Sequence, residues 1–332
     1  MTPTYQDELR RAAEAITAAD GLALGCHVTP DGDALGSMLA MMHLARAQAM
    51  PCCASWPEPF VVARHYRSIP GTELAIAPNR FPVAPKMMMT FDCGSLRRLQ
   101  ELGEPACRAR DSGHLIVVDH HASNDRYGTI NPIDVDAAAT AVVVRDLARE
   151  LGWELNREAA LCLYTGLVTD TGRFQFNSTT PSVFALAHEL ASFDLPIAKL
   201  SRELFEEHRF AYLKLAARAL GRAELDTARS FVSSFVTRGD LGDFGVDYDE
   251  IEGLIEWLRS TAEAEVACLC KEAPDGVRVS LRSVSEVDVG AIAIALGGGG
   301  HRLAAGFTMN APVAEVLAAV RARLPDVVAT TR

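Results

Sequence analysis

Histidine and aspartate recur in four short segments of the chain, in a pattern that suits divalent metal ions. The candidate ligands are His27, Asp31, Asp33, Asp92, His120 and Asp170. Imidazole and carboxylate ligands together suit Mn²⁺, Fe²⁺, Zn²⁺ or Co²⁺ better than Ca²⁺. Four carboxylates close to one point repel one another unless cations balance them. Two divalent ions would balance four such charges, so the sequence predicts a two-metal site that can accept an anionic substrate.

Each segment also has a plainer interpretation when it is taken alone. The Asp31-Gly-Asp33 sequence suits a surface turn, and Asp92 could cap the helix expected after it. The histidines of 119–121 could be hydrogen-bonded structural residues, and Asp170 could be an ordinary loop residue. The occurrence of all four segments at the ends of expected strands or helices favours the metal site.

Continuous apolar runs precede the polar residues of three segments, at 21–28, 87–94 and 114–121. Such runs between helices are typical of a parallel sheet covered on both faces. In a Rossmann-like sheet of this kind, ligands bind at the carboxyl ends of the strands. A fourth strand is expected at 51–56. Helices are expected at 5–19, 34–49, 137–151, 157–169 and 181–192.

The pattern changes after this α/β region. Residues 196–222 favour a connecting helix or helix pair. After it we expect a strand at 230–238, a helix at 247–260, a hairpin at 265–283, a helix at 288–296, a strand at 304–309 and a helix from about 312. The expected organisation is an N-terminal α/β domain at 1–195, a helical connector at 196–228 and a smaller α+β domain at 229–332.

The C-terminal domain carries a glycine run that could bind phosphate. Glycine lets backbone N–H groups approach a phosphate closely, and an arginine at a strand end can bind a phosphate through two N–H groups. The candidate substrate contacts are Arg282, Gly298, Gly299, Gly300 and His301. A tight turn is the alternative for the glycines, and the run is not a Walker motif. A phosphate clamp on a separate domain favours short oligonucleotides or nucleotide bisphosphates over a long polymer.

Composition limits the classes of partner. The 332 residues carry a formal net charge of −11 and contain no basic block, which argues against a long duplex nucleic acid. The eight cysteines form no Cys-x-x-Cys pair, as expected for a cytoplasmic protein with reduced thiols. The sequence has no apolar stretch of about 18 residues, so no membrane-spanning helix is predicted.

In combination, the four segments resemble the DHH phosphoesterases, which are named for the Asp-His-His triplet seen here at 119–121. The resemblance covers HVTPDGDALGS, TFDCGS, VVDHHASND and LVTDTGRF, in that order. It extends through VSLRS and GGGGHRLAAGF to the DHH-associated domain. Within the family the chain is most similar to the nano-RNases, short oligoribonucleases that also hydrolyse 3′-phosphoadenosine 5′-phosphate.

This resemblance implies a metal-dependent hydrolase with defined residue roles. One ion would be held by His27, Asp31 and Asp92, and the other by Asp33, Asp92, His120 and Asp170. The ions would be Mn²⁺ and would activate a water molecule. His121 would act on the leaving group as the catalytic residue, and Asp119 would orient a neighbouring group. The nano-RNase branch also implies a homodimer.

Three other activities on the same scaffold remain alternatives. A family-II inorganic pyrophosphatase would share the N-terminal motifs, but its basic Ser-Arg-Lys-Lys-Gln-like segment is not found in this sequence. A processive single-strand exonuclease would need additional binding domains and a basic channel. A non-catalytic nucleotide sensor would have lost a ligand, whereas all the expected ligands are present.

Overall fold

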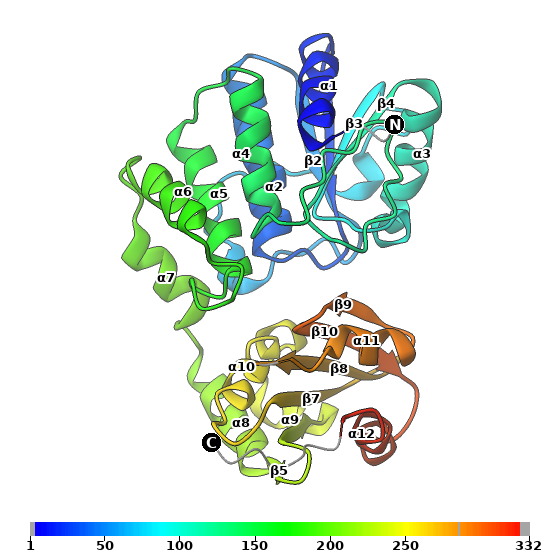
Figure 1. Cartoon of the computed structure of the whole chain (residues 1–332), viewed down its shortest axis with the longest axis vertical. Coiled ribbons are helices and arrows are strands. Elements are labelled where there is room, and N and C mark those ends of the chain that lie inside the picture. The colour runs from blue at the N-terminus through cyan, green and yellow to red at the C-terminus, as the bar shows by residue number, and fades with distance from the viewer. Residues whose placement is uncertain (1–3, 285, 326–332) are drawn as a thin grey trace. The chain divides into compact units, whose positions relative to one another are not determined.

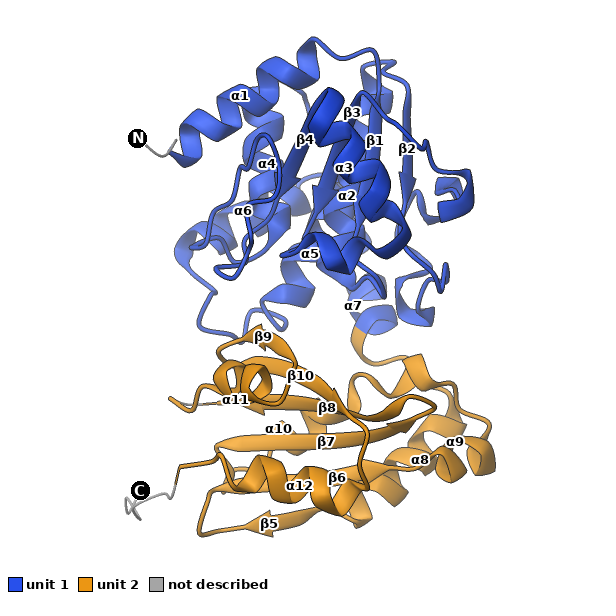
Figure 2. Cartoon of the chain, turned by 90° about the vertical axis from the view of Figure 1, so that its right-hand side faces the viewer, with its two compact units in different colours: residues 1–204 blue, residues 205–332 orange. Residues whose placement is uncertain are grey.

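The computed structural model describes residues 4–284 and 286–325 and divides into two compact units, residues 1–204 and 205–332 (Figures 1 and 2). Unit 1 is α/β and unit 2 is α+β, as the sequence predicts. Residues 326–332, the end of the α+β domain expected at 229–332, lie outside the described residues. None of the described helices is both long and apolar enough to cross a membrane.

The sheet of unit 1 is parallel throughout, with strand order β2-β1-β3-β4. Its strands are β1 (Leu22–Cys26), β2 (Cys52–Ser55), β3 (Met87–Phe91) and β4 (His114–Val118). Every residue of β1 and β3 is buried. This burial confirms the covered parallel sheet that the continuous apolar runs predicted.

Unit 1 also contains helices, some of which contact the sheet directly while others pack on those helices. They are α1 (Tyr5–Thr17), α2 (Gly32–Ala47), α3 (Gly103–Ser112), α4 (Thr140–Glu150), α5 (Arg157–Asp170), α6 (Pro181–Ala191) and α7 (Ile197–Phe205). Helix α2 contacts the sheet and also α5, so it is buried almost all round. A Cβ atom at Gly36 would lie 2.4 Å from the carbonyl oxygen of Cys162, so only glycine permits this close approach of α2 and α5.

Unit 2 is built on a mixed sheet with strand order β5-β6-β7-β8-β10-β9. Only the β6–β7 pair among these neighbours is parallel within the described residues. Its elements are α8 (Phe210–Gly221), β5 (Glu224–Asp226), β6 (Phe231–Val236), α9 (Arg238–Phe244), α10 (Leu254–Arg259), β7 (Val266–Ala273), β8 (Gly276–Ser283), α11 (Val289–Ala295), β9 (Gly299–His301), β10 (Ala304–Met309) and α12 (Val313–Arg321).

An apolar core lies on each face of this second sheet. Alternate residues of a strand face opposite sides. Cys268 and Cys270 therefore join the core that includes α11 and α12, whereas Ala267 and Leu269 join the core that includes α8 and α10. The two buried cysteines serve as small apolar side chains. All eight cysteines of the chain are free thiols.

The structure differs from the expected elements in several places. Residues 247–260 form a 3₁₀ turn at Tyr248–Ile251 and then α10, instead of one helix, because Gly253 separates them. The segment 196–222, by contrast, contains two helices, α7 and α8, which is the helix pair that its pattern allowed. The helix expected after Asp92 is a 3₁₀ helix at Leu96–Leu102 followed by α3. The sequence pattern missed α9, β5 and β9. Strand β9 has the unfavourable sequence Gly-Gly-His and is defined by its pairing with β10.

Candidate metal centre

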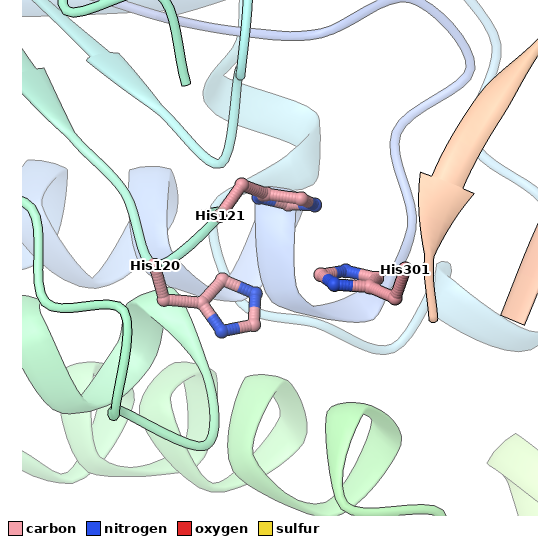
Figure 3. A group of neighbouring side chains, drawn as sticks. All are labelled: His120, His121 and His301. Atoms are coloured by element: carbon pink, nitrogen blue, oxygen red, sulfur yellow. The ribbon is translucent and has the colours of Figure 1, made fainter. Parts of the chain in front are cut away.

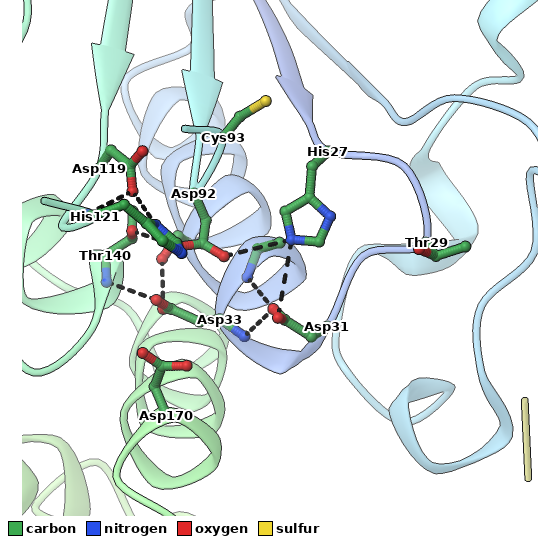
Figure 4. A network of polar contacts seen from close by, with 12 residues as sticks. His27, Thr29, Asp31, Asp33, Asp92, Cys93, Asp119, His121, Thr140 and Asp170 are labelled. Carbon is green, nitrogen blue, oxygen red and sulfur yellow. Dashed lines mark hydrogen bonds and ion pairs between the residues drawn. The ribbon is translucent and has the colours of Figure 1, made fainter. Parts of the chain in front are cut away.

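Three strands of unit 1 deliver polar side chains to one edge of the sheet (Figure 4). His27 follows β1, Asp92 follows β3, and the triplet 119–121 follows β4. These side chains meet because the carboxyl ends of parallel neighbours lie at the same edge. The helices that border this edge add Asp31, Asp33 and Asp170.

The first group of possible ligands contains His27, Asp31 and Asp92, whose ligand atoms lie within 4.8 Å of one another. The Nε2 atom of His27 lies 3.5 Å from Asp92 Oδ2 and 3.8 Å from Asp31 Oδ2. The Nδ1 atom of His27 lies 2.8 Å from the carbonyl oxygen of Val28. A proton on Nδ1 satisfies that carbonyl and leaves the Nε2 lone pair facing the carboxylates, as a metal ligand requires.

Asp31 and Asp33 lie at the start of α2 rather than in the irregular loop that the Asp-Gly-Asp sequence suggested. Asp31 is the N-cap residue, and its Oδ1 accepts hydrogen bonds from the N–H groups of Asp33 and Ala34 at 3.2 and 3.0 Å. Its Oδ2 is the oxygen nearest to His27. The start of α2 therefore fixes the Asp31 carboxylate in position.

The second group contains Asp33, Asp92 and His120, again with ligand atoms within 4.8 Å of one another. The Nε2 atom of His120 lies 3.6 Å from Asp92 Oδ1 and 3.2 Å from Asp170 Oδ2. Its Nδ1 atom lies 3.1 Å from the carbonyl oxygen of Ala137, which orients the ring. Asp92 belongs to both groups and lies between the two histidines.

The N-terminus of α4 holds Asp33, which is fully buried. Asp33 Oδ2 accepts a hydrogen bond from the Thr140 N–H at 2.6 Å, and Oδ1 accepts one from the Ala141 N–H at 3.0 Å. The Thr140 hydroxyl donates to Asp92 Oδ1 at 2.9 Å. Sequence reasoning missed Thr140, because a threonine inside an expected helix at 137–151 gives no sign of distant partners.

His121 forms a close pair with Asp119. Because β4 ends at Val118, the chain can turn and bring both histidine rings to the site (Figure 3), where their centroids lie 4.7 Å apart. The Nδ1 atom of His121 lies 2.6 Å from Asp119 Oδ1. Burial opposes the charged form of His121, but the hydrogen bond to Asp119 and the charge of Asp92 raise its pKa to about 9. His121 is therefore protonated at neutral pH.

The carboxylates of this site are crowded together. Burial and the negative charge of Asp92 raise the pKa of Asp33 to about 7. Burial and the charges of Asp33 and Asp92 also raise the pKa of Asp170. Burial acts in the same direction on Asp92, but the neighbouring imidazoles, above all that of His27, outweigh it and lower the pKa of Asp92.

This set of donors fits divalent metal ions. Carboxylate oxygens and imidazole nitrogens in one cluster match the ligand preference of Mn²⁺, Fe²⁺, Zn²⁺ and Co²⁺. Asp92 and Asp170 form their ion pairs with imidazoles. The raised pKa values of Asp33 and Asp170 show that the remaining negative charge is costly without further cations. Bound divalent ions would remove this cost.

Asp92 does not cap a helix, which was the alternative interpretation of this residue. Its φ angle is 53°, in the left-handed region, and Ser95 is the N-cap of the following 3₁₀ helix. A residue other than glycine in this region costs on the order of 1–3 kcal/mol, and such residues cluster at functional sites. The Asp92 N–H donates to the Val118 carbonyl at 3.1 Å, which ties this turn to the end of β4.

Unit 2 aligns its candidate substrate contacts across three neighbouring strands. Arg282 of β8 and His301 of β9 are both in register with Ala304 of β10. Residues in register on adjacent strands face the same side of the sheet, so Arg282 and His301 flank the small side chain of Ala304. The next row on the same face is Ser280, Gly306 and Gly299. The face between Arg282 and His301 is therefore lined by small residues.

The glycines of this run serve different purposes. A Cβ atom at Gly298 would lie 2.1 Å from the carbonyl oxygen of Gly306, and Gly300 has a φ angle of 136°, so the fold itself requires both glycines. This agrees with the tight-turn interpretation for those two residues. Apart from Gly299 itself and its two chain neighbours, no described residue has an atom within 4 Å of a Cβ atom placed at Gly299. Gly299 therefore leaves open space on the face that carries Arg282.

An acidic side chain fixes the orientation of Arg282. Its Nε donates to Glu256 Oε1 at 2.8 Å, and Oε2 of the same carboxylate accepts from Arg259 Nε at 2.6 Å. Burial opposes ionisation of Glu256, but the two guanidinium groups outweigh it and lower the pKa of Glu256. Glu256 is therefore ionised at neutral pH and holds Arg282 in place.

Comparisons with known proteins assign the chain to a family. The chain matches the DHH family N-terminal domain over residues 23–167 and the DHHA1 domain over residues 229–330. A protein of Thermus thermophilus named bifunctional oligoribonuclease and PAP phosphatase NrnA is 33% identical, over 93% of this chain and 90% of its own. The chain belongs to the DHH family. The resemblance inferred from its four motifs is thereby confirmed.

Other proteins align with this DHH-family chain over most of their length. A Bacillus subtilis protein of the same name is 27% identical over 89% of this chain and 91% of its own. An exopolyphosphatase-related protein from Bacteroides fragilis has a TM-score of 0.87 at 23% identity and covers 96% of this chain and 95% of its own. That likeness confirms the fold.

The DHH-domain match includes every proposed metal ligand except Asp170, which lies just beyond residue 167. Geometry joins Asp170 to the others, because its Oδ2 lies 3.2 Å from His120 Nε2. The substrate contacts proposed from the glycine run and from Arg282 lie within the DHHA1 match.

Proposed function

We propose that this DHH-family protein is a metal-dependent phosphoesterase that hydrolyses short oligoribonucleotides, 3′-phosphoadenosine 5′-phosphate, or both, to mononucleotides. The observation that carries the proposal is the position of Asp92, which belongs at once to the ligand group of His27 and to that of His120. One carboxylate between two groups of donors is the arrangement that a pair of metal ions requires.

The cluster divides naturally into two ligand sets. His27, Asp31 and Asp92 would hold one ion, and Asp33, Asp92, His120 and Asp170 would hold the other. Mn²⁺ suits this mixture of imidazole and carboxylate. When bound, the ions supply a nucleophile at neutral pH and offset the charge that develops on the phosphate.

His121 is the catalytic side chain of the proposal. Its Nδ1–H donates to Asp119, which leaves the proton on Nε2 for transfer to the leaving oxygen. Asp119 is fully buried and stabilises the imidazolium form of His121, as the raised pKa of about 9 indicates. The N–H groups at the start of α4 hold the Asp33 carboxylate in place.

Unit 2 provides the selection for short substrates in this proposal. Arg282 and His301 would bind a phosphate on the face lined by Ala304 and Gly299. Contact with the end of a substrate favours short chains over long ones. The relatives from Thermus thermophilus and Bacillus subtilis are named as oligoribonuclease and PAP phosphatase, which supports the same class of substrate.

A product time course tests the proposed activity. The metal-stripped protein is supplied with Mn²⁺ and given 5′-labelled di-, tri- and long RNA, beside 3′-phosphoadenosine 5′-phosphate and pyrophosphate. We expect rapid hydrolysis of the dinucleotide or of the bisphosphate and slow hydrolysis of the long RNA. Preference for pyrophosphate, or processive degradation of the long RNA, would replace the proposal with one of the alternative activities.

The family resemblance extends the proposal to the assembly and the compartment. We propose a homodimer, for which light scattering at micromolar concentration should give twice the mass of one chain. A single sharp monomer mass would refute this. The free thiols of all eight cysteines support a reducing cytoplasm.

A further inference from the structure

The side-chain amide of Asn124 binds Asp119 Oδ2, the carboxylate oxygen that accepts no described hydrogen bond from His120 or His121. Asp119 Oδ1 accepts hydrogen bonds from the N–H of His120 at 2.7 Å, the N–H of His121 at 3.1 Å and the ring Nδ1–H of His121 at 2.6 Å. The other oxygen, Oδ2, accepts a hydrogen bond from the side-chain amide of Asn124. Without Asn124, Asp119 Oδ2 would lose this hydrogen bond, and the carboxylate could rotate.

The same amide group also contacts the segment that carries Asp92. Asn124 Nδ2 lies 3.3 Å from the carbonyl oxygen of Cys93, the residue directly after Asp92. Asp92 has a left-handed backbone, which needs external support. One side chain therefore joins the residue that orients His121 to the turn that presents the shared carboxylate.

Asn124 is itself fixed in orientation. Its Oδ1 accepts a hydrogen bond from the N–H of Arg126 at 2.6 Å, and its backbone N–H donates to the carbonyl oxygen of His121 at 3.1 Å. An acceptor that faces Arg126 leaves the amide NH₂ facing Asp119 and Cys93, the two acceptors that it serves. The amide thus has a partner at both of its ends.

We propose that Asn124 is a positioning residue that aligns His121 with the reacting phosphate through Asp119. The inference rests on the proposed function of His121. Loss of a group that orients a catalytic ligand typically costs about 10–100-fold in activity, and a displacement of about 1 Å can cost on the order of 100-fold. Asn124 touches neither His121's Nε2 nor any proposed ligand atom, so its effect should fall on kcat rather than on metal affinity.

Tyr127 provides a matched control. Its hydroxyl donates to the same Cys93 carbonyl at 3.0 Å and lies 2.9 Å from Thr90 Oγ1. None of the contacts described for Tyr127 reaches Asp119. Tyr127→Phe therefore removes support from the Asp92 turn while it leaves the Asp119–His121 pair intact. A contribution of Asn124 that is only structural would be matched by this variant.

The test compares Asn124→Ala, Asn124→Ser, Tyr127→Phe, His121→Ala and the double variant Asn124→Ala/His121→Ala in the full chain. The readouts are kcat and KM on a dinucleotide and the affinity for Mn²⁺ by calorimetry. We expect Asn124→Ala to lower kcat about 10–100-fold, with KM and Mn²⁺ affinity within about threefold. The serine variant, which can retain a donor, should lose less, and Tyr127→Phe should remain close to wild type.

The double variant distinguishes a positioning role of Asn124 from a purely structural role. If Asn124 acts through His121, its removal costs nothing further once His121 is gone. An equal loss of kcat in both backgrounds would overturn the inference and leave the role of His121 intact. An equal effect of Asn124→Ala and Tyr127→Phe would also overturn it. Wild-type activity of His121→Ala would overturn both the inference and the proposed catalytic role.

Discussion

Asp33 and Asp170 of unit 1 have electrostatic environments opposite to that of Asp240 in unit 2. In unit 1, burial and neighbouring carboxylates raise the pKa values of Asp33 and Asp170. In unit 2, Asp240 accepts hydrogen bonds from Arg222, Arg218 and the N–H of Thr237, and these contacts hold its pKa below the ordinary value. Arginines of the chain balance the charge of Asp240, whereas no arginine is among the described partners of Asp33 and Asp170, whose charges bound cations would balance.

This difference separates acids that stabilise the fold from acids that hold a ligand. An arginine partner satisfies Asp240 permanently, so that carboxylate has no need of an ion. The crowded carboxylates of unit 1 carry an electrostatic cost that a metal ion would relieve. A raised carboxylate pKa next to imidazole is thus a better indicator of the functional site than burial alone.

Removal of Asp92 should have the largest effect. Because Asp92 belongs to both ligand groups, Asp92→Ala should weaken both ions together. Metal ions supply several kcal/mol of stabilisation, so activity should fall by at least about a thousandfold. Kinetics in metal-defined buffer and circular dichroism check the result. Activity within a few fold of wild type would remove the two-metal interpretation.

Arg282→Ala should affect substrate affinity next most strongly. Loss of a charge-assisted hydrogen bond to phosphate costs about 1.5–3 kcal/mol, or roughly 10–150-fold in affinity. We expect KM for a phosphate-terminated dinucleotide to rise by this factor while Mn²⁺ affinity stays unchanged. Arg278→Ala is the matched control, since Arg278 lies on the same strand and face and pairs with Asp275.

A small diester separates binding from catalysis in this variant. Bis-p-nitrophenyl phosphate is too short to require the phosphate clamp, so Arg282→Ala should leave its hydrolysis almost unchanged. An equal loss of both activities would show that Arg282 contributes to catalysis or folding, and an equal effect of Arg278→Ala would remove the specific role of Arg282.

Gly299→Ala should have a smaller effect, confined to substrate binding. The structure has room for this methyl group, so thermal stability should stay near that of wild type, while KM rises several-fold because the group occupies the face beside Arg282. Gly298→Ala should instead lower the melting temperature, since its Cβ would lie 2.1 Å from a carbonyl oxygen. Unchanged KM in Gly299→Ala would show that no ligand approaches this glycine.

The smallest expected effect is the pH dependence of the stability of the metal-free protein. The raised pKa values of unit 1 and the lowered pKa values of unit 2 should act in opposite directions. Asp33 has a pKa of about 7 against an ordinary value of 3.8. Between these values the native state binds a proton that the unfolded chain has released, so the free energy of unfolding falls as pH rises. The raised pKa of His121, about 9, acts in the same direction up to that pH. The lowered pKa values of Asp240 and Glu256 stabilise the fold above the ordinary carboxyl range and lose that effect only as pH falls through it.

Thermal unfolding in the presence of a chelator measures this dependence. One unit of pKa corresponds to about 1.4 kcal/mol, and about 1 kcal/mol shifts the melting temperature of a folding unit of the size of unit 1 by roughly 2–4 °C. For Asp33 alone, about two pKa units separate pH 5 from its pKa, so the melting temperature should fall by roughly 5–10 °C between about pH 5 and about pH 8. Added Mn²⁺ should abolish the fall. A melting temperature that rises over this range would contradict the charge crowding in unit 1.

Much of unit 1 could be predicted because its signals are local. Continuous apolar runs that end in Asp or His identify covered parallel strands, and a parallel sheet brings those ends to one edge. The approximate places of β1, β3 and β4 follow from this pattern. The joint occurrence of these three segments and the Asp170 segment at the end of a helix then indicates the metal site more strongly than any one of them.

The features that the sequence did not predict depend on contacts between residues that are far apart in the chain. Thr140 lies beside Asp33 and Asp92 only because α4 packs against α2. A single threonine in the sequence does not indicate such a contact. Asn124 becomes informative only when the turn after β4 places it next to Asp119. Strand β9 is a pair of glycines and a histidine, which have little strand propensity and acquire their structure from β10.

The central claim is that the acid cluster of unit 1 is a two-metal centre. Calorimetric titration of the metal-stripped protein with Mn²⁺ at neutral pH, in buffers of different ionisation enthalpy, tests it directly. We predict binding of two ions per chain with net release of protons, because Asp33 must lose its proton to become a ligand. Binding of fewer than two ions, binding without proton release, or unchanged binding in Asp92→Ala would contradict the claim.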